Sequence, residues 1–429
     1  RIMGCMSAKN KAPATPVLRR RLSLGEIGPG DDVSVDVSEE DRSMLMALTQ
    51  KQIMDFVSGD ATAGRKYSVG SETDQQGHLV KSFSSKSVAL QGSEFKAARE
   101  GIGFACKKGL KPEAPNQDSF FIMKVEENFS VYGVFDGHGR KGHDISNFVK
   151  DNLPKVLFSQ DMLQTDPARA LEKTFDKTQY LIEKATAMKK IDASRSGTTC
   201  SVVLHDHQKK MLWVAHVGDS RVVLGKATPT KDGKKMWSSV DLTIDHKPDL
   251  PEERARIEKA GGVVIFDGGW NYRVYAKGKT DSRGKRYPGL NMSRAMGDLS
   301  GFNDAGISAK PDVKKQFVAV RPTEGDDCQP NQPNGSAGPG ERRPSTVSSA
   351  SHPTISSHGL DPSSDKFLLL CSDGVWEFIS SEQAVKLVGK FPREEAESAA
   401  EQLAAMAWEQ WMREMDGKVV DDITAICIY

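Results

Sequence analysis

The feature that most constrains the fold of this chain is a series of short β-type runs, several of which have an aspartate at one end. Each run is rich in β-branched and other apolar residues, and polar or glycine-containing stretches separate most of the runs. The runs are 129–135, 200–205, 211–216, 221–224, 262–266, 366–371 and 423–429. The stretch 205–210 is typical of a hairpin loop between two of them.

Helical patterns lie between these runs. One begins at Asp249-Leu-Pro-Glu252, which resembles a helix cap, and stops at Gly261. Another opens at Pro392 and continues to about residue 415. Its apolar stripe at helical spacing predicts packing against a core, and consists of Ala399, Leu403, Met406 and Trp411. Strands that come in runs, with helices separated from them, predict an α+β domain.

Composition limits the class of protein. Of the 429 residues, 38% are hydrophobic and 27% are charged, as in water-soluble globular proteins. The formal net charge of +1 gives no bulk attraction to nucleic acid. No apolar stretch approaches the ~18 residues that a membrane-spanning helix needs. The six cysteines have no paired spacing and we see no secretory signal, so we expect a reduced, cytoplasmic location.

We predict three regions along the chain. Residues 1–37 are polar and lack periodicity, which is typical of a disordered tail. Residues 38–95 are expected to form a helix and then a linker, with 58–95 read mostly as linker. Residues 96–429 are expected to form one folded domain. A Pro-, Ser-, Gly- and Asn-rich insertion at 323–364 interrupts it, and a loop of this length is usually disordered or regulatory.

Seven short motifs, most of them built around aspartate or glycine, lie in order along this domain. They are Pro115-Asn-Gln-Asp118, Val134-Phe-Asp-Gly-His-Gly139, Ser196-Gly-Thr-Thr199, Val217-Gly-Asp-Ser-Arg221, Ser293-Arg-Ala-Met-Gly-Asp298, Cys371-Ser-Asp-Gly-Val-Trp376 and Asp421-Asp-Ile-Thr424. An isolated Asp-Gly is usually a β-turn, but the ordered set resembles the metal-dependent Ser/Thr protein phosphatases of type 2C. The resemblance covers about 101–429. It implies a four-layer αββα fold, in which two antiparallel β-sheets pack as a sandwich with helices on the outer faces.

Metal-dependent hydrolysis of a phosphate ester explains why so many carboxylates are needed. The uncatalysed reaction is very slow, and a pair of cations can activate water, hold it in line and screen the phosphate charge. Hard ions such as Mg²⁺ and Mn²⁺ prefer oxygen ligands. The candidates are Asp118, Asp136, Asp219, Asp298, Asp373, Asp421 and Asp422. A carboxylate at a strand end is held by a rigid scaffold and still faces solvent.

The resemblance assigns roles to particular ligands of two Mg²⁺ or Mn²⁺ ions. Asp136 is expected to bridge the two metals, and Gly137 to offer its backbone carbonyl to one of them. Asp373 and Asp421 are expected to bind the first metal. Asp422 stands where the family more often has Asn, so we rank it below Asp421.

The residue after the bridging Asp136 and Gly137 is His138. The resemblance implies that His138 is the general acid that protonates the departing Ser or Thr alkoxide. An imidazole with a pKa near ~6.5 suits that task around neutral pH. A lone histidine is more often structural, so this assignment depends on its position beside Asp136.

A weaker third metal site is expected at Asp219, together with Asp373. Glu377 stands where the family often has the Asp that completes this site. For Asp298 the alternative reading is a structural partner of Arg294.

Two departures from the family pattern bear on the second metal and on the substrate. Gln117 precedes Asp118 where the family usually has Glu, and an uncharged amide is a weaker ligand. The family also often has a phosphate-binding Arg at the position of Glu113. The plausible substitute is Lys111, which binds phosphate as a point charge and lacks the bidentate fork of Arg.

The segment 246–292 is expected to form a flap beside the site. It carries the aromatic and basic residues Trp270, Tyr272, Arg273 and Tyr275 and the basic stretch 277–286. This surface could contact a phosphopeptide, and a solvated loop is an equally compatible reading.

The amino-terminal tail and the insertion carry candidate modification sites. If Met3 is the initiator, Gly4 is a candidate for myristoylation and Cys5 for palmitoylation, which would attach the protein peripherally to a membrane. An ordinary disordered tail is the alternative. Ser23 and Ser345 each follow arginines and resemble kinase sites that would tune location or access.

Together these features predict a protein serine/threonine phosphatase in which metal-bound hydroxide hydrolyses phosphoserine or phosphothreonine at a binuclear Mg²⁺ or Mn²⁺ centre. We expect a monomer that acts on phosphorylated protein and has no nucleic-acid partner. Two alternatives stay open. Gln117 and the missing Arg slightly favour a pseudophosphatase that serves as a phosphoprotein-binding or scaffold module, and the intact Asp136, His138, Asp373 and Asp421 weigh against it. The near-zero net charge opposes a phosphodiesterase acting on nucleic acid.

Overall fold

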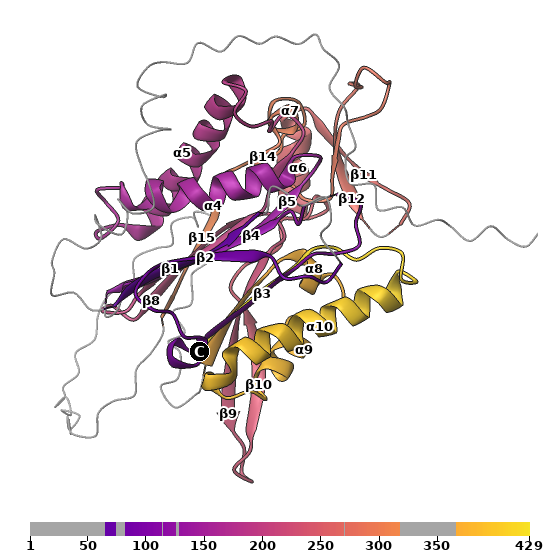
Figure 1. Ribbon diagram of the computed structural model, residues 1–429. Coiled ribbons are helices and arrows are strands. Elements are labelled where there is room, and N and C mark those ends of the chain that lie inside the picture. The colour runs from indigo at the N-terminus through magenta and orange to yellow at the C-terminus, as the bar shows by residue number, and fades with distance from the viewer. Residues whose placement is uncertain (1–64, 74–81, 114, 126–127, 270, 318–365) are drawn as a thin grey trace, which may run out of the picture.

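The computed structural model describes residues 65–73, 82–113, 115–125, 128–269, 271–317 and 366–429. Figure 1 shows two β-sheets facing each other between helices. The helices α4 (Gly142–Phe158) and α5 (Pro167–Ala187) lie on one side of the pair, and α9 (Ser381–Val388) and α10 (Ala396–Glu414) lie on the other. The predicted tail 1–37, the helix predicted after residue 38 and the insertion 323–364 fall outside the described residues.

The larger sheet has nine strands with the main order β15-β8-β7-β5-β4-β1-β2, and β6 and β14 extend it beside β5. All of its strand pairs are antiparallel. The strands are β1 (Lys66–Glu72), β2 (Ser87–Gly92), β4 (Asp118–Val125), β5 (Phe129–His138), β6 (Gly197–Thr198), β7 (Cys200–Asp206), β8 (Met211–Val217), β14 (Met296–Gly297) and β15 (Asp312–Phe317).

The smaller sheet has five antiparallel strands in the order β10-β9-β16-β17-β3. They are β3 (Ile102–Lys107), β9 (Arg221–Pro229), β10 (Lys235–Asp241), β16 (Lys366–Cys371) and β17 (Ile423–Ile428). Shorter helical elements lie around the two sheets. They are α3 (Ala97–Glu100), α7 (Leu299–Asp304), α8 (Asp373–Trp376) and η1 (Arg393–Glu395).

Three buried clusters of side chains hold these layers together. In β5, Val131 and Phe135 pack beneath α4 and α5, whereas Tyr132 and Val134 pack against the other sheet. This alternation follows from the two-residue period of a strand. A third cluster joins the smaller sheet to α9 and α10 and includes the buried Trp411. The confirmed fold class is therefore α+β, with helices covering the outer faces of two antiparallel sheets.

The segment predicted as a flap is a separate small unit. The strands β11 (Gly262–Phe266), β12 (Tyr272–Ala276) and β13 (Pro288–Leu290) form a three-stranded antiparallel sheet beside helix α6 (Pro251–Lys259). Its own core contains Ile257, Val274 and Leu290. The predicted cap differs in detail, because Leu250 is the N-cap residue of α6 and no side chain caps the helix.

Each β-type run predicted from the sequence overlaps an observed strand, and the hairpin between β7 and β8 is confirmed. The interpretation of residues 58–95 as mostly linker is wrong for β1 and β2. Serine and glycine weaken the β signal of these strands, and β1 gains its stability from pairing with β4 and from burial of Tyr67 and Val69. The folded domain therefore begins earlier than residue 96.

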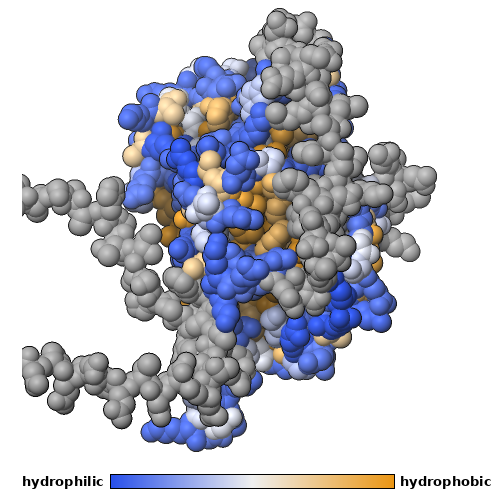
Figure 2. Space-filling view, turned by 90° about the vertical axis from the view of Figure 1, so that its left-hand side faces the viewer, coloured by the Kyte–Doolittle hydropathy of each residue, from blue (hydrophilic) through white to orange (hydrophobic). Residues whose placement is uncertain are grey.

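In the described part of the chain, no helix is long and apolar enough to cross a membrane. The face in Figure 2 instead combines broad hydrophilic areas with a strip of apolar surface between them.

Candidate functional site

The ends of two neighbouring strands bring the first pair of carboxylates together. Asp118 begins β4, Asp136 lies near the end of β5, and the antiparallel register places these two residues directly opposite each other. Opposed residues in such a pair have β-carbons about 5 Å apart. Asp118 is fully buried and Asp136 is 8% exposed.

The smaller sheet contributes the second pair. Asp373 is the first residue of α8 and lies two residues after the end of β16, and Asp421 lies two residues before β17. The hydroxyls of Ser372 and Thr424 donate to Oδ2 of Asp118 at 2.8 and 2.7 Å. These two hydrogen bonds tie the carboxylate of one sheet to the strand ends of the other.

The charges of the other three carboxylates act on Asp136. Burial raises the pKa of Asp136 well above its ordinary value, and the charges of Asp118, Asp373 and Asp421 raise it further. Burial, with the charge of Asp422, also raises the pKa of Asp118 to about 6. Carboxylates crowded in this way are stabilised by a cation.

The buried oxygen atoms of the site show whether its residues suit a hard metal ion. Among the described residues, Oδ1 of Asp118 and Oε1 of Gln117 are buried and accept no hydrogen bond. Such oxygen atoms are the donors that Mg²⁺ and Mn²⁺ prefer. In the described part of the chain, no three His, Cys, Asp or Glu side chains are arranged so that they could hold a metal ion as they stand. The donor set fits a divalent cation in chemistry.

Lys111 supplies a positive charge inside this group. Its ammonium nitrogen lies 2.5 Å from Oδ1 of Asp421 and 3.2 Å from Oδ2 of Asp422, and the side chain is 3% exposed. Burial lowers the pKa of Lys111, but the carboxylates outweigh it and raise that pKa well above its usual range. The residue predicted to bind phosphate thus contacts the expected metal ligands directly.

Asp422 has a different set of partners from Asp421. Its Oδ1 accepts from the backbone N–H of Gly109 at 2.8 Å, and its Oδ2 accepts from that of Gln117 at 2.8 Å. Lys108 lies 3.2 Å from the same carboxylate. Asp422 therefore fixes the two loops that carry Lys111 and Gln117, which agrees with its lower rank as a ligand.

Gln117 and Gly137 define the other wall of the site. The Gln117 amide nitrogen donates to the carbonyl of Gly139 at 2.7 Å, which leaves its oxygen for another partner. A β-carbon on Gly137 would lie 2.4 Å from the carbonyl oxygen of Gly142 and 2.6 Å from that of Gln117. Only glycine fits this close approach of backbone.

His138 lies beside the carboxylates and contacts one further aspartate. Its Nε2 is 2.6 Å from Oδ2 of Asp298, and both side chains are buried. Burial disfavours the imidazolium form, but the charge and hydrogen bond of Asp298 outweigh burial and raise the pKa of His138. Nδ1 of His138 forms no hydrogen bond with any residue that the structure describes.

The partner of Asp298 corrects one reading of the sequence. Arg294 does not contact Asp298, but bonds Glu253 at 2.6 Å and Asp312 at 2.8 Å. Asp298 instead adopts a left-handed backbone conformation ahead of α7, with φ of 46°, and its carboxylate accepts a hydrogen bond from Nε2 of His138. The motif that contains Asp298 marked the residue, but only the tertiary fold reveals its partner.

Asp219, the expected ligand of a weaker third metal, lies next to a lysine from the flap segment. Its Oδ2 is 2.5 Å from Nζ of Lys247. The pKa of Lys247 is raised, because the charges of Asp219 and Asp373 outweigh burial. Lys247 thus feels the charges of both Asp219 and Asp373, and Glu377 is half-buried at the end of α8.

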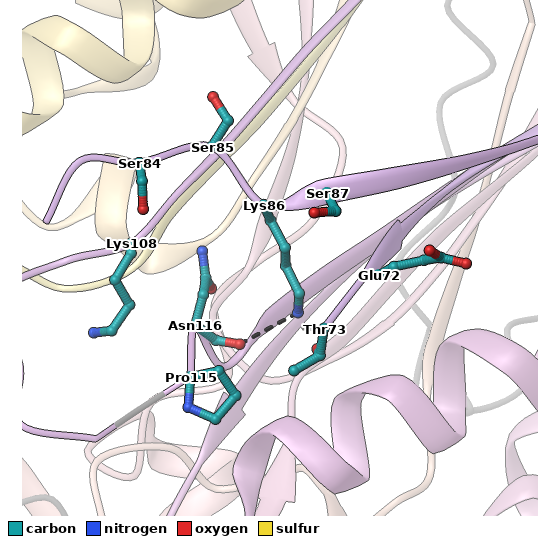
Figure 3. A pocket seen from close by; sticks show the side chains of 9 residues that line it. All are labelled: Glu72, Thr73, Ser84, Ser85, Lys86, Ser87, Lys108, Pro115 and Asn116. Carbon is teal, nitrogen blue, oxygen red and sulfur yellow. Dashed lines mark hydrogen bonds between the residues drawn. The ribbon is translucent and has the colours of Figure 1, made fainter. Parts of the chain in front are cut away.

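Lys86 is a supporting residue that the sequence analysis missed. It lies between β1 and β2 and lines a small polar pocket with Thr73, Lys108 and Asn116 (Figure 3). Its ammonium donates to the backbone carbonyls of Asn116 and Asp118 at 3.2 and 2.5 Å, and to the Ser119 hydroxyl at 3.2 Å. Lys86 therefore stabilises the start of β4 through these hydrogen bonds. No motif signals this role.

The remaining predicted positions fall outside the described residues. They are the lipidation candidates Gly4 and Cys5, the phosphorylation candidates Ser23 and Ser345, and Trp270 of the flap.

Comparison with known proteins identifies relatives of this chain. The family model described as Protein phosphatase 2C matches residues 107–414. "Probable protein phosphatase 2C 48" of Oryza sativa is 31% identical over 73% of this chain and 80% of its own length. "Probable protein phosphatase 2C 72" of Arabidopsis thaliana is 32% identical over 80% of this chain and 90% of its own length. Among solved structures, the serine-threonine phosphatase 2C of Toxoplasma gondii has the same fold, with a TM-score of 0.55 at 22% identity over 76% of this chain and 93% of that one.

Proposed function

This chain belongs to the protein phosphatase 2C family of metal-dependent Ser/Thr phosphatases, and we propose that it hydrolyses phosphoserine and phosphothreonine in proteins at a centre holding two Mg²⁺ or Mn²⁺ ions. The observation that carries the proposal is the convergence of Asp118, Asp136, Asp373 and Asp421 at the adjoining ends of two sheets. Four buried carboxylates with one lysine among them leave negative charge that divalent cations would neutralise.

The expected ligands come from both sheets, so the ions would also join the two halves of the sandwich. Asp118 and Asp136 would hold them from the larger sheet, and Asp373 and Asp421 from the smaller one. When bound, the ions would supply an activated water and neutralise the phosphate charge. A weaker third ion at Asp219 is part of the proposal.

The protein's own contribution to the reaction centres on His138. With Nε2 bonded to Asp298, the imidazolium has its Nδ1 proton left for the departing alkoxide of serine or threonine. The raised pKa keeps a larger share of His138 protonated near neutral pH than an isolated imidazole would have. Asp298 is a positioning residue in this scheme, because it acts through His138.

Two features tune the affinity for metal and substrate. Gln117 offers an uncharged oxygen where a carboxylate would give a stronger ligand, so one ion would bind more weakly. Lys111 lies against Asp421 and adds a positive charge that a substrate phosphate could also approach. Both features are compatible with turnover at higher metal concentration.

Turnover with and without metal tests the proposal. Wild-type protein, Asp136→Ala and the exposed control Asp232→Ala would be assayed on p-nitrophenyl phosphate and on a phosphothreonine peptide, with Mn²⁺, Mg²⁺ or EDTA. We expect metal-dependent hydrolysis of both substrates by the wild type and the control, and none by Asp136→Ala. Folded wild-type protein without turnover in any metal would contradict the proposal and favour a phosphoprotein-binding role.

A further inference from the structure

A basic loop of the flap segment is connected through Arg195 to the residue that follows His138. The residues between β12 and β13, 277–286, include five basic side chains and one acidic one, in a chain whose net charge is +1. Lys277, Arg283, Lys285 and Arg286 are exposed. Arg140 and Lys141, which follow His138 and Gly139 in the chain, are exposed as well. We call these six residues the basic rim.

Arg195 connects this loop to the site. Its guanidinium lies 3.1 Å from Oδ2 of Asp281 in the loop and 5.0 Å from the centre of the Tyr287 ring. Its backbone carbonyl packs so closely on Gly139 that a β-carbon there would lie 2.4 Å away. Arg195 therefore links the base of the loop to Gly139, the residue that follows His138.

The loop is also held in one shape by its acidic residue. Oδ1 of Asp281 accepts from the backbone N–H of Arg283 at 2.9 Å and from that of Lys285 at 2.8 Å. The backbone N–H of Asp281 donates to the Lys285 carbonyl at 2.8 Å. Asp281 is thus engaged with Arg195 and with the loop backbone.

We infer that the basic rim binds acidic residues that flank the phosphorylated Ser or Thr of a substrate, so this phosphatase prefers phosphoproteins with Asp-, Glu- or phosphate-rich neighbours. The inference builds on the proposed function, since it names the substrates of the same site. Cations concentrated at the edge of a reaction centre attract acidic chains and speed their encounter. An extended peptide spans about 3.4 Å per residue, so residues near the phosphate would pass the rim.

The preference can be measured with three phosphothreonine peptides that differ only in their flanks, which are acidic, alanine-based or basic. The readout is the ratio of kcat/KM between the acidic and the alanine-based peptide within each protein. The test variant is Lys285→Glu/Arg286→Glu. The control is Lys231→Glu/Lys234→Glu, a matched charge reversal in the exposed β9–β10 hairpin, at the opposite end of the molecule (Figure 1).

For the wild type and the control we expect the acidic peptide to be favoured about 10-fold at low salt, with the ratio falling as ionic strength rises. In the test variant the ratio should fall to about 1 or below, with a gain on the basic peptide. A wild-type ratio near 1, or an acidic preference that survives the charge reversal, would overturn the inference. An equal loss on all three peptides would show a structural role for the loop and would also overturn it.

Hydrolysis of p-nitrophenyl phosphate by the wild type distinguishes failure of the inference about the basic rim from failure of the proposed function. If it occurs without any preference for acidic peptides, only the inference about the basic rim fails. If no phosphate ester is hydrolysed, the proposed function itself fails.

Discussion

At the scale of single residues, the pair of His138 and Asp298 shows how a neighbour sets the chemistry of the site. The sequence places the two residues far apart, and the fold brings Nε2 and Oδ2 to 2.6 Å. The carboxylate favours the charged imidazole and orients it. The protonation state of the proposed general acid therefore depends on a residue that does not contact the phosphate.

Replacing Asp298 with Asn should move the pH profile. A general acid must be protonated, so kcat falls as pH rises through the pKa of His138, and Asp298 raises that pKa above its ordinary value. In Asp298→Asn the pKa falls, so we expect this decline to begin at lower pH and kcat at pH 8 to drop by about 10-fold or more. The profile of kcat against pH measures both effects. The exposed Asp192→Asn is the control. If the decline of kcat with rising pH began at the same pH in Asp298→Asn as in the wild type, the assignment of His138 as the general acid would be refuted.

At the scale of elements, segments far apart in sequence support one another. Lys86 precedes the part of the chain that matches the family model, yet its ammonium holds carbonyls on either side of Gln117. In the flap, Glu253 of α6 bonds Arg294, Arg256 and Ser293 and so joins the helix to the strand-like motif before β14. The contacts of Lys86 test how β4 supports metal binding, and those of Glu253 test how α6 stabilises the flap.

Loss of Lys86 should weaken metal binding. The change Lys86→Met leaves the carbonyls of Asn116 and Asp118 without their donor and loosens the start of β4. Changes to groups that support metal ligands commonly cost 10–100-fold in affinity, so we expect the half-saturating Mn²⁺ concentration to rise about 10-fold, with a smaller change in kcat at saturating metal. Lys96→Met, an exposed lysine of the same region, should leave both values unchanged. Equal Mn²⁺ dependence in wild type and Lys86→Met would show that β4 does not need this support.

Glu253 should stabilise the flap in a pH-dependent way. Burial opposes ionisation, but Arg294, Arg256 and Ser293 outweigh it and lower the pKa of Glu253 from 4.5 to about 2. A lowered pKa stabilises the folded state fully above the unfolded value of 4.5, and this contribution is lost as pH falls toward 2. With allowance for solvent screening, Glu253→Gln should cost about 1–2 kcal/mol at pH 7.

Urea unfolding at pH 7, 5 and 3.5 measures that contribution. The difference in unfolding free energy between wild type and Glu253→Gln should be constant above pH 5 and shrink below it. Glu258→Gln, an exposed glutamate on the same helix, should show no such difference. A penalty for Glu253→Gln that did not change between pH 7 and 3.5 would argue against the ion pair.

At the scale of the whole molecule, the strength of the local signal decided what the sequence could predict. Strands buried on both faces, such as β16, appear as continuous apolar runs and were predicted with their correct bounds. β1 and β2 were missed because their stability comes from pairing and not from composition. The long helices α4 and α5 were not singled out either, although Asp166 and Pro167 form a recognisable start of α5.

The strength of the local signal also decided which features of the site could be predicted. The ordered motifs predicted which aspartates would converge, since each lies beside a strand end. They could not reveal that Lys111 contacts Asp421, that Asp422 bonds backbone N–H groups, or that Asp298 contacts His138. Those contacts join segments separated by more than 100 residues, and no local pattern encodes them.

The central claim is that four buried carboxylates from two sheets form one binuclear metal centre. Calorimetric titration with Mn²⁺ at pH 7.5 tests it most directly, with wild-type protein, Asp136→Asn and the exposed control Asp232→Asn. We predict two equivalents for the wild type and the control, one of them bound more weakly than the other, and loss of at least one equivalent in Asp136→Asn with its fold intact. No binding to folded wild-type protein, or unchanged binding to Asp136→Asn, would contradict the account.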